Sequence, residues 1–246
     1  MRGQLQRATL LVAAILSSAL LAGCTSPTPQ PTPSEHPVTT EESQLLAITR
    51  FANFDAGSRP FHTEFTVSGV KTKMMGWVDY SSGLGFVSVT GSFGAEALLW
   101  TNSALGAIPR APDVDGNPVL PIPDLTDPGW QIQTLDPKVS AVDALLAAIS
   151  ALGSDRPDNP LLLQQSGARW LRSDKVDGTP VTVFAAPPSD EPVASGSGTA
   201  QGDTLRLWVN KNGLLLRAEV KLNNVWDTVE FPDRPAPKLE KPEGIG

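Results

Sequence analysis

Few side chains in this sequence have the chemistry of a nucleophile or a general base. The chain has one cysteine, Cys24, and two histidines, His36 and His62, among 246 residues. A Ser-His-Asp or Cys-His site needs an imidazole to take the proton from the nucleophile. His36 lies in a Pro- and Thr-rich segment, so such a site would have to be built on His62. A histidine at the edge of a strand explains His62 more simply, and we predict that the chain is not an enzyme.

The acidic side chains offer one arrangement for a metal ion. The stretch PDVDGNP, residues 112–118, places Asp113, Asp115 and Asn117 around a glycine. Hard cations prefer oxygen ligands of this kind, but the third acid and the distant glutamate of a calcium loop are missing. Asp and Asn beside Gly also form ordinary turns. The sequence therefore predicts no metal site and no cofactor.

A pair of adjacent acids, Asp190 and Glu191, is the remaining candidate for acid–base chemistry. The pair lies in a Ser- and Gly-rich loop, PPSDEPVASGSGTAQG. The loop shows no neighbouring group that would shift the pKa values of the two carboxyls apart, as an acid–base pair requires. The sequence also lacks the H-E-x-x-H, P-loop, G-x-S-x-G and G-x-G-x-x-G patterns. The sequence thus contains none of these motifs for hydrolysis or for nucleotide binding.

The flanks of Cys24 explain the lone thiol. Arg2 and Arg7 precede an apolar run from Ala8 to Leu21, and small residues follow it, which is the layout of a secretory signal. The run is about 14 residues long, whereas a helix needs about 20 to span a bilayer. We therefore predict a signal peptide over residues 1–23.

The residues Leu21-Ala22-Gly23-Cys24 resemble the lipobox of bacterial lipoproteins. The resemblance implies that the thiol of Cys24 is acylated and that the chain is cut before it. The alternative is an unpaired thiol left in an ordinary signal, which is uncommon in secreted proteins. Two or more acyl chains on one residue attach a protein stably to a bilayer. Cys24 is thus the predicted lipid anchor, on the extracytoplasmic face of the cell membrane.

The composition limits what the exported part can bind. The formal net charge is −7, and the signal contributes basic residues only. A negative chain is a poor ligand for nucleic acid and for anionic lipid, so attachment would rest on the acyl chains. No cysteine remains for a disulfide, so the core alone must hold the fold.

The chain divides into four predicted segments. After the signal, residues 24–40 form a Pro-, Thr- and Ser-rich tether, whose Thr-Pro repeats are either a plain linker or glycosylated. Residues 41–231 form one domain, and residues 232–246 form an unstructured Pro-rich tail. Within the domain, residues 110–129 are so rich in Pro and Asp that we expect a long loop, either functional or mobile.

Hydrophobic periodicity predicts a mainly β domain with helices at its front and middle. Thr39 and Glu42 have the spacing of a capping box before a helix over Glu41–Asn53. Asp136 is the expected N-cap of a second helix that stops at Gly153, and Asn159 caps a short third one. About eleven short runs of β-rich residues separated by turns complete the domain, without a βαβ rhythm.

The order of these elements resembles the LolA/LolB and LppX/LprG group of envelope lipoprotein carriers. The residue-level match is the hairpin LRLWVNKNGLLLRAEV, with Trp208-Val209-Asn210, then Gly213, then Leu214 to Arg217. The resemblance implies one strongly curved antiparallel sheet, an unclosed half-barrel, covered by helices and holding an apolar cavity. The long loop at 110–129 and the loop near Ser195 depart from that pattern.

Two functional hypotheses follow, besides a hydrolase, which would need a convergent polar cleft near His62 or the Asp113 loop. The first is a membrane-anchored carrier of an apolar or lipidated ligand, and the second is an envelope interaction or scaffold protein without a cavity, which predicts a contiguous exposed apolar patch. If the chain holds a cavity, the candidate residues that line it are Phe65, Met74, Met75, Leu98, Trp100, Leu145 and Ile149. The alternative for any one of these residues is that it belongs to a solid hydrophobic core.

Overall fold

The computed structural model describes residues 34–67, 69–92, 94–188 and 203–245. The chain divides into two units, Met1–Pro33 and Ser34–Gly246, and the described residues all belong to the second. Cys24, the signal, most of the tether and the loop around Ser195 lie outside the described residues, so the predictions made for them are untested.

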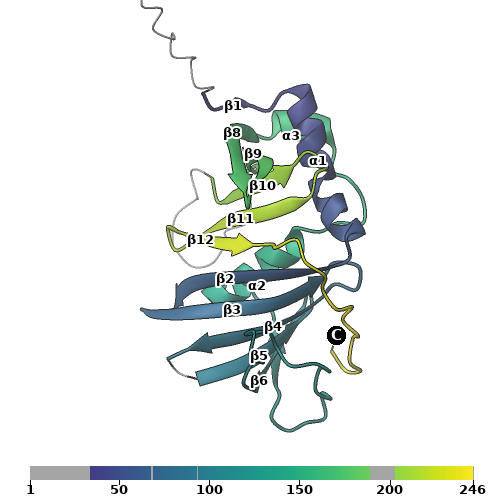
Figure 1. Cartoon of the computed structure of the whole chain (residues 1–246), viewed down its shortest axis with the longest axis vertical. Coiled ribbons are helices and arrows are strands. Elements are labelled where there is room, and N and C mark those ends of the chain that lie inside the picture. The colour runs from purple at the N-terminus through teal and green to yellow at the C-terminus, as the bar shows by residue number, and fades with distance from the viewer. Residues whose placement is uncertain (1–33, 68, 93, 189–202, 246) are drawn as a thin grey trace, which may run out of the picture. The chain divides into compact units, whose positions relative to one another are not determined.

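One antiparallel sheet of twelve strands makes up most of the described structure (Figure 1). The sheet order is β1-β8-β9-β10-β11-β12-β2-β3-β4-β5-β6-β7. The strands are β1 His36–Pro37, β2 Ser58–Val67, β3 Val70–Asp79, β4 Leu84–Gly91, β5 Gly94–Trp100, β6 Ala104–Pro109, β7 Gln131–Thr134, β8 Arg169–Val176, β9 Thr179–Ala185, β10 Leu205–Asn210, β11 Leu215–Leu222 and β12 Val225–Glu230. The helices are α1 Thr40–Asp55, α2 Ala141–Ala151 and α3 Pro160–Gln165.

The predicted fold class is confirmed, with one strand more than expected. The sheet has two free edges, β1 and β7, so it is not closed into a barrel. One hydrophobic cluster on its inner face joins Trp170 of β8, Phe61 of β2 and Leu105 of β6, because the sheet curves around α2 and part of α1. In Figure 1, α2 lies behind β12 and β2.

Helix α1 begins as its sequence predicts. The N–H of Glu42 donates to Oγ1 of Thr39 at 3.3 Å, and the N–H of Thr39 donates to Oε2 of Glu42 at 2.8 Å. This reciprocal pair is the expected capping box. Asn159 likewise caps α3 through a 2.9 Å bond from the N–H of Leu161, followed by Pro160 at the first helical position.

Helix α2 begins later than predicted. Ser140, not Asp136, is its N-cap, and the N–H of Asp143 donates to Oγ of Ser140 at 3.0 Å. The carboxylate of Asp136 instead accepts the N–H of Lys138 at 2.9 Å, which makes a turn before the helix. An Asp in a turn and an Asp at an N-cap both accept a hydrogen bond from a following N–H, so the sequence alone does not distinguish a turn at Asp136 from a helix start there.

The end of the predicted tether belongs to the sheet. His36 and Pro37 pair with Trp170 and Arg169 as the edge strand β1, and the His36 ring stacks on that of Trp170 with 4.9 Å between centroids. Val38 is buried in the inner core. Two residues are too short for a periodicity signal, so this strand could not be predicted.

The outer face of β4, β5 and β6 is also covered. Leu84, Phe86 and Leu99 are fully buried there, beneath the 110–129 loop and the C-terminal tail. The tail has no helix or strand, but Leu239 and Ile245 are buried in the same cluster, only 2% and 4% exposed. The expectation of an unstructured tail is therefore corrected for these residues, because two apolar side chains anchor a segment otherwise rich in Pro.

The 110–129 loop has no helix or strand, as expected, and its acidic residues organise its turns. Oδ1 of Asp113 accepts the N–H groups of Asp115 and Asn117 at 2.9 and 2.8 Å. Oδ1 of Asp124 accepts the N–H of Thr126 at 2.8 Å, and Ile122 and Leu125 pack on the outer cluster. The carboxylates of Asp113 and Asp124 thus accept hydrogen bonds from the backbone of the loop itself.

Candidate functional site: an apolar pocket beside helix α2

An apolar pocket of about 400 Å³ opens between α2 and the hairpin ends of the first half of the sheet. Its walls come from the β2–β3 and β4–β5 hairpins, from the end of β6 and from the first turn of α2. The lining residues are Val67, Val70, Thr72, Val89, Gly91, Gly94, Ala95, Glu96, Pro109 and Val142.

Strand periodicity places these side chains together. Val89 pairs with Met74 on one side and with Glu96 on the other, so residues of three strands stand side by side on the inner face. Pro109 ends β6 opposite Glu96. The wall is therefore aliphatic, and the two polar side chains on it are Thr72 and the exposed Glu96.

Helix α2 supplies the cover. Leu145, Leu146 and Ile149 are fully buried against the sheet, and Oγ of Ser150 accepts the indole N–H of Trp100 at 2.9 Å. Val142, one turn before Leu146, is only partly buried and faces the pocket. The helix is thus fixed at its centre and leaves space at its N-terminal end.

Six of the seven predicted lining residues lie in one cluster, beneath the pocket and not on its wall. Met74, Trp100, Leu145 and Ile149 are 0% exposed, and Phe65 and Leu98 are 4% exposed. Trp100 packs edge-on against Phe61 with 6.1 Å between ring centroids. These six side chains form a packed floor.

Met75 lies on the other face of the sheet. Its Sδ is 3.3 Å from where a Cβ on Gly116 of the 110–129 loop would lie, and it is not part of the inner cluster. Consecutive residues of a strand point to opposite faces, so Met74 and Met75 cannot line the same cavity. The prediction for Met75 is therefore corrected.

The residues of the pocket wall were missed by the sequence reasoning. Val67 and Val89 share the inward parity of Phe65 and Val87, and both lie next to glycine turns. Extending the alternation of inward- and outward-facing residues to the ends of the strands would have predicted that Val67 and Val89 face inward. Val142 belongs to the predicted apolar stripe of α2, but the sequence does not show that its helix turn stands away from the sheet.

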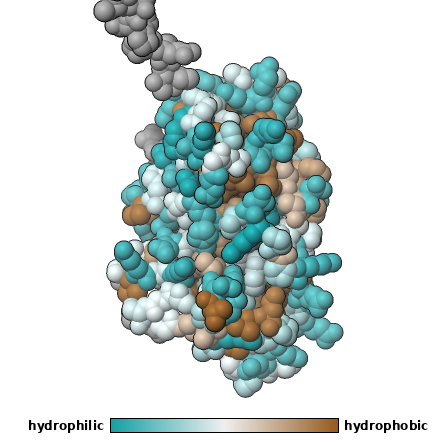
Figure 2. All heavy atoms as spheres, in the orientation of Figure 1, coloured by the Kyte–Doolittle hydropathy of each residue, from teal (hydrophilic) through white to brown (hydrophobic). Residues whose placement is uncertain are grey.

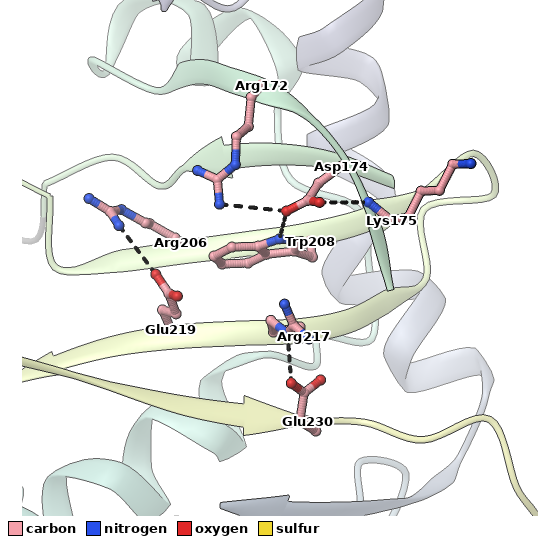
Figure 3. A network of polar contacts seen from close by, with 8 residues as sticks. All are labelled: Arg172, Asp174, Lys175, Arg206, Trp208, Arg217, Glu219 and Glu230. Atoms are coloured by element: carbon pink, nitrogen blue, oxygen red, sulfur yellow. Dashed lines mark hydrogen bonds and ion pairs between the residues drawn. The ribbon is translucent and has the colours of Figure 1, made fainter. Parts of the chain in front are cut away.

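The hairpin that carries the sequence resemblance forms as predicted, with β10 and β11 joined at Gly213. Val209 points into the inner core, and Trp208 is buried on the outer face. The indole N–H of Trp208 donates to Oδ2 of Asp174 at 2.9 Å, and Arg172 and Arg217 lie over its ring at 5.4 and 5.7 Å (Figure 3). This outer face is held by polar and cation–π contacts.

The same outer face continues toward β12. Arg217 is paired with Glu230 at 2.7 Å, and Arg206 with Glu219 at 3.2 Å (Figure 3). Arg206 also lies 4.1 Å from the centroid of the Trp226 ring. The charges on this face are therefore largely paired within the sheet.

The residues considered for hydrolysis and metal binding are not brought together. His62 lies in β2, paired in register with Met75 and Glu230, while Asp113 lies in the 110–129 loop and accepts backbone N–H groups. Among the described residues, no group of three or more His, Cys, Asp or Glu side chains could hold a metal ion. None of the described helices is long and apolar enough to cross a membrane.

No protein-family model matches this chain, and no curated protein sequence matches it. Solved structures with a similar course of the chain include the mycobacterial lipoproteins LprF and LppX. LprF from Mycobacterium bovis is 13% identical, with a TM-score of 0.42 over 86% of this chain and 100% of its own. LppX from Mycobacterium tuberculosis is 12% identical, with a TM-score of 0.41 over 79% and 97%.

A third similar structure is an outer membrane lipoprotein-sorting protein domain from Vibrio parahaemolyticus. It is 10% identical, with a TM-score of 0.24 over 79% of this chain and 92% of its own. LppX is one of the lipoproteins named in the sequence resemblance, and its likeness to this chain is remote.

Proposed function

We propose that this chain is an exported lipoprotein, anchored through Cys24, that binds an apolar ligand such as a lipid acyl chain between its curved sheet and α2. The pocket beside α2 is the observation that carries the proposal. Its volume of about 400 Å³ falls in the range of small-molecule sites, which are about 300–1,000 Å³. Covering its aliphatic wall with an apolar ligand removes that surface from water, which stabilises the complex by about 25 cal/mol for each Å² of apolar surface buried.

The size of the pocket limits the ligand. A water molecule in the liquid takes about 30 Å³, so the pocket holds about a dozen groups of that size. The side chains of Met74, Trp100 and Ile149 are fully buried in the packed core and are not on the pocket wall. The proposal is therefore for one acyl chain or a compact apolar group at a time, with the rest of the ligand outside the pocket.

Ligand binding to the purified full-length mature protein tests the proposal. Lipid extraction followed by mass spectrometry is expected to identify a co-purifying apolar molecule, and a fluorescent fatty acid is expected to bind in competition with it. The variant Val142→Arg places a charge at the pocket wall and is expected to weaken binding of the probe at least tenfold. The matched control, Val139→Arg, changes a side chain that is 71% exposed and outside the pocket.

Two results would count against the carrier proposal. One is a protein free of lipid that also fails to bind the probe. The other is equal probe affinity for the two arginine variants, which would place the binding somewhere other than the pocket.

The second candidate function is an interaction protein of the cell envelope. It is favoured by the 110–129 loop, where Val114 is fully exposed and Leu120 is 40% exposed. On the face shown in Figure 2, however, the hydrophobic residues form several separate areas among polar ones, whereas this candidate needs a contiguous patch. Partner capture that is lost in Val114→Asp and kept in Val142→Arg would favour it over the carrier.

A further inference from the structure

Helix α3 exposes an apolar pair that no other described element covers. Leu161 and Leu162 are 64% and 61% exposed, while Leu163 of the same turn packs on the inner core. The helix is fixed to α1, because the side chain of Gln164 donates to Oγ of Ser43 at 2.8 Å. The two leucines are therefore held outward on an ordered element.

Five charged residues that flank this pair are ion-paired, and two arginines facing three carboxylates leave them one net negative charge. No charged residue lies between Asn159 and Ala168. Around that stretch, Arg50 pairs with Asp158 at 3.0 Å, and Arg169 pairs with Glu35 at 2.8 Å and with Asp203 at 2.6 Å. A surface of this kind suits an uncharged apolar medium, and it has little to gain from a highly charged partner.

The chain enters the described structure beside α3. Val38 donates its N–H to the carbonyl of Ala168, and β1 pairs with β8 directly after α3. In Figure 1, β1 and α3 lie at the same end of the sheet. Cys24 is ten residues before Ser34, and ten residues reach at most about 35 Å when fully extended. An acylated Cys24 would thus limit the distance of Ser34 from the bilayer to about 35 Å. The edge strand β7 is at the other end of the strand order.

From these observations we infer that Leu161 and Leu162 insert into the surface of the bilayer to which the chain is anchored, so that α3 orients the domain on the membrane. The inference rests on the proposed acylation of Cys24, because two leucines are too few to bind a bilayer without a tether. The insertion is driven by apolar contact, and it does not depend on salt or on anionic lipid.

A fluorescent label on either end of the sheet tests the inference. The probe is NBD on the full-length acylated chain, attached at Gln165→Cys beside the leucines or at Val114→Cys in the 110–129 loop. Acylation of Cys24 leaves the introduced thiol as the reactive one. On vesicles of neutral phosphatidylcholine, we expect quenching by brominated lipid to be at least threefold stronger at position 165 than at position 114, at low and high salt alike.

The variant Leu161→Gln/Leu162→Gln, labelled at position 165, should lose this difference and keep the melting temperature of the parent. Equal quenching at the two positions would overturn the inference. Shielding of position 165 without vesicles, together with a dimeric mass, would also overturn it and would assign the leucines to a second copy.

Flotation with the vesicles separates this inference from its premise. A chain that floats and shows no difference between the labels keeps the anchor and refutes the docking of α3. A chain that fails to float refutes the anchor, and the docking inference with it.

Discussion

Asn53 and Arg59 are joined by a 2.9 Å hydrogen bond from Nη1 of the arginine to Oδ1 of the asparagine, and both side chains are buried. Asn53 also donates to the carbonyl of Leu152 at 2.8 Å, and Arg59 donates to the carbonyl of Leu215 at 2.6 Å. Burial lowers the pKa of Arg59. Two residues thus tie α1, β2, β11 and the end of α2 together through a charge stabilised by oxygen dipoles and by the ring of Phe231.

Replacing Asn53 by leucine is expected to lower the free energy of unfolding by about 3 kcal/mol, because the substitution leaves a buried guanidinium short of an acceptor. Urea unfolding followed by tryptophan fluorescence measures the change. Gln165→Ala, at an exposed position of α3, serves as the control and should leave the midpoint unchanged. An unchanged midpoint for Asn53→Leu would show that water or another acceptor replaces the amide.

The Trp208–Asp174 bond predicts a pH dependence of stability. Hydrogen bonds from the Trp208 indole and from the N–H of Lys175 lower the pKa of Asp174 below its ordinary 3.8. A carboxyl whose pKa is lower in the folded state stabilises the fold above the unfolded value, near pH 4, and this stabilisation is lost as the pH falls through the folded value.

The variant Asp174→Asn should therefore be less stable than the parent at about pH 6, and the difference should shrink toward pH 3. Urea midpoints over this pH range give the comparison. A difference that stays constant with pH would mean that the indole bond acts through geometry alone and not through the charge.

The buried tail predicts a cost for a substitution near the C-terminus. Leu239→Ala removes a side chain that is 2% exposed and should lower the free energy of unfolding by about 2–3 kcal/mol. Val114→Ala, at a fully exposed position, should have no measurable effect. Thermal unfolding measures the melting temperatures of the two variants. Equal melting temperatures would mean that the tail does not pack on β4 and β5.

A methyl group on Gly85 should disturb the floor of the pocket. Its Cβ would lie 2.0 Å from the indole ring of Trp100, which is held between Phe61 and Ser150 of α2. Gly85→Ala is expected to cost about 1–3 kcal/mol. In Gly91→Ala the nearest atom would be 3.4 Å away, an ordinary contact, so this variant is the control. Similar denaturation midpoints for the two variants would contradict the tight packing of Trp100.

Much of the fold was accessible from the sequence, because period-two patterns and turn residues mark eleven of the twelve strands. The capping box at Thr39 and Glu42 predicted the start of α1 for the same reason, since its chemistry is local. Strand β1 escaped prediction because it has two residues and pairs with a strand far along the chain.

The candidate site was less accessible. Met74 and Met75 are both apolar, and only the register of β3 decides which of them faces inward. The sequence could not show that the large side chains Trp100 and Ile149 fill the interior while the smaller Val89 and Val142 border open space. That difference depends on the distance between α2 and the sheet, which is a tertiary property.

The position of β12 has a consequence for how the chain folds. The last strand lies between β11 and β2, in the middle of the sheet, so the first half of the sheet gains its neighbour only when residue Glu230 is available. The side chain of Arg59 likewise cannot form its hydrogen bond to the carbonyl of Leu215 until that later part of the chain is available. Folding therefore depends on contacts between residues more than 150 positions apart, which makes it slow and leaves β2 an exposed edge during synthesis.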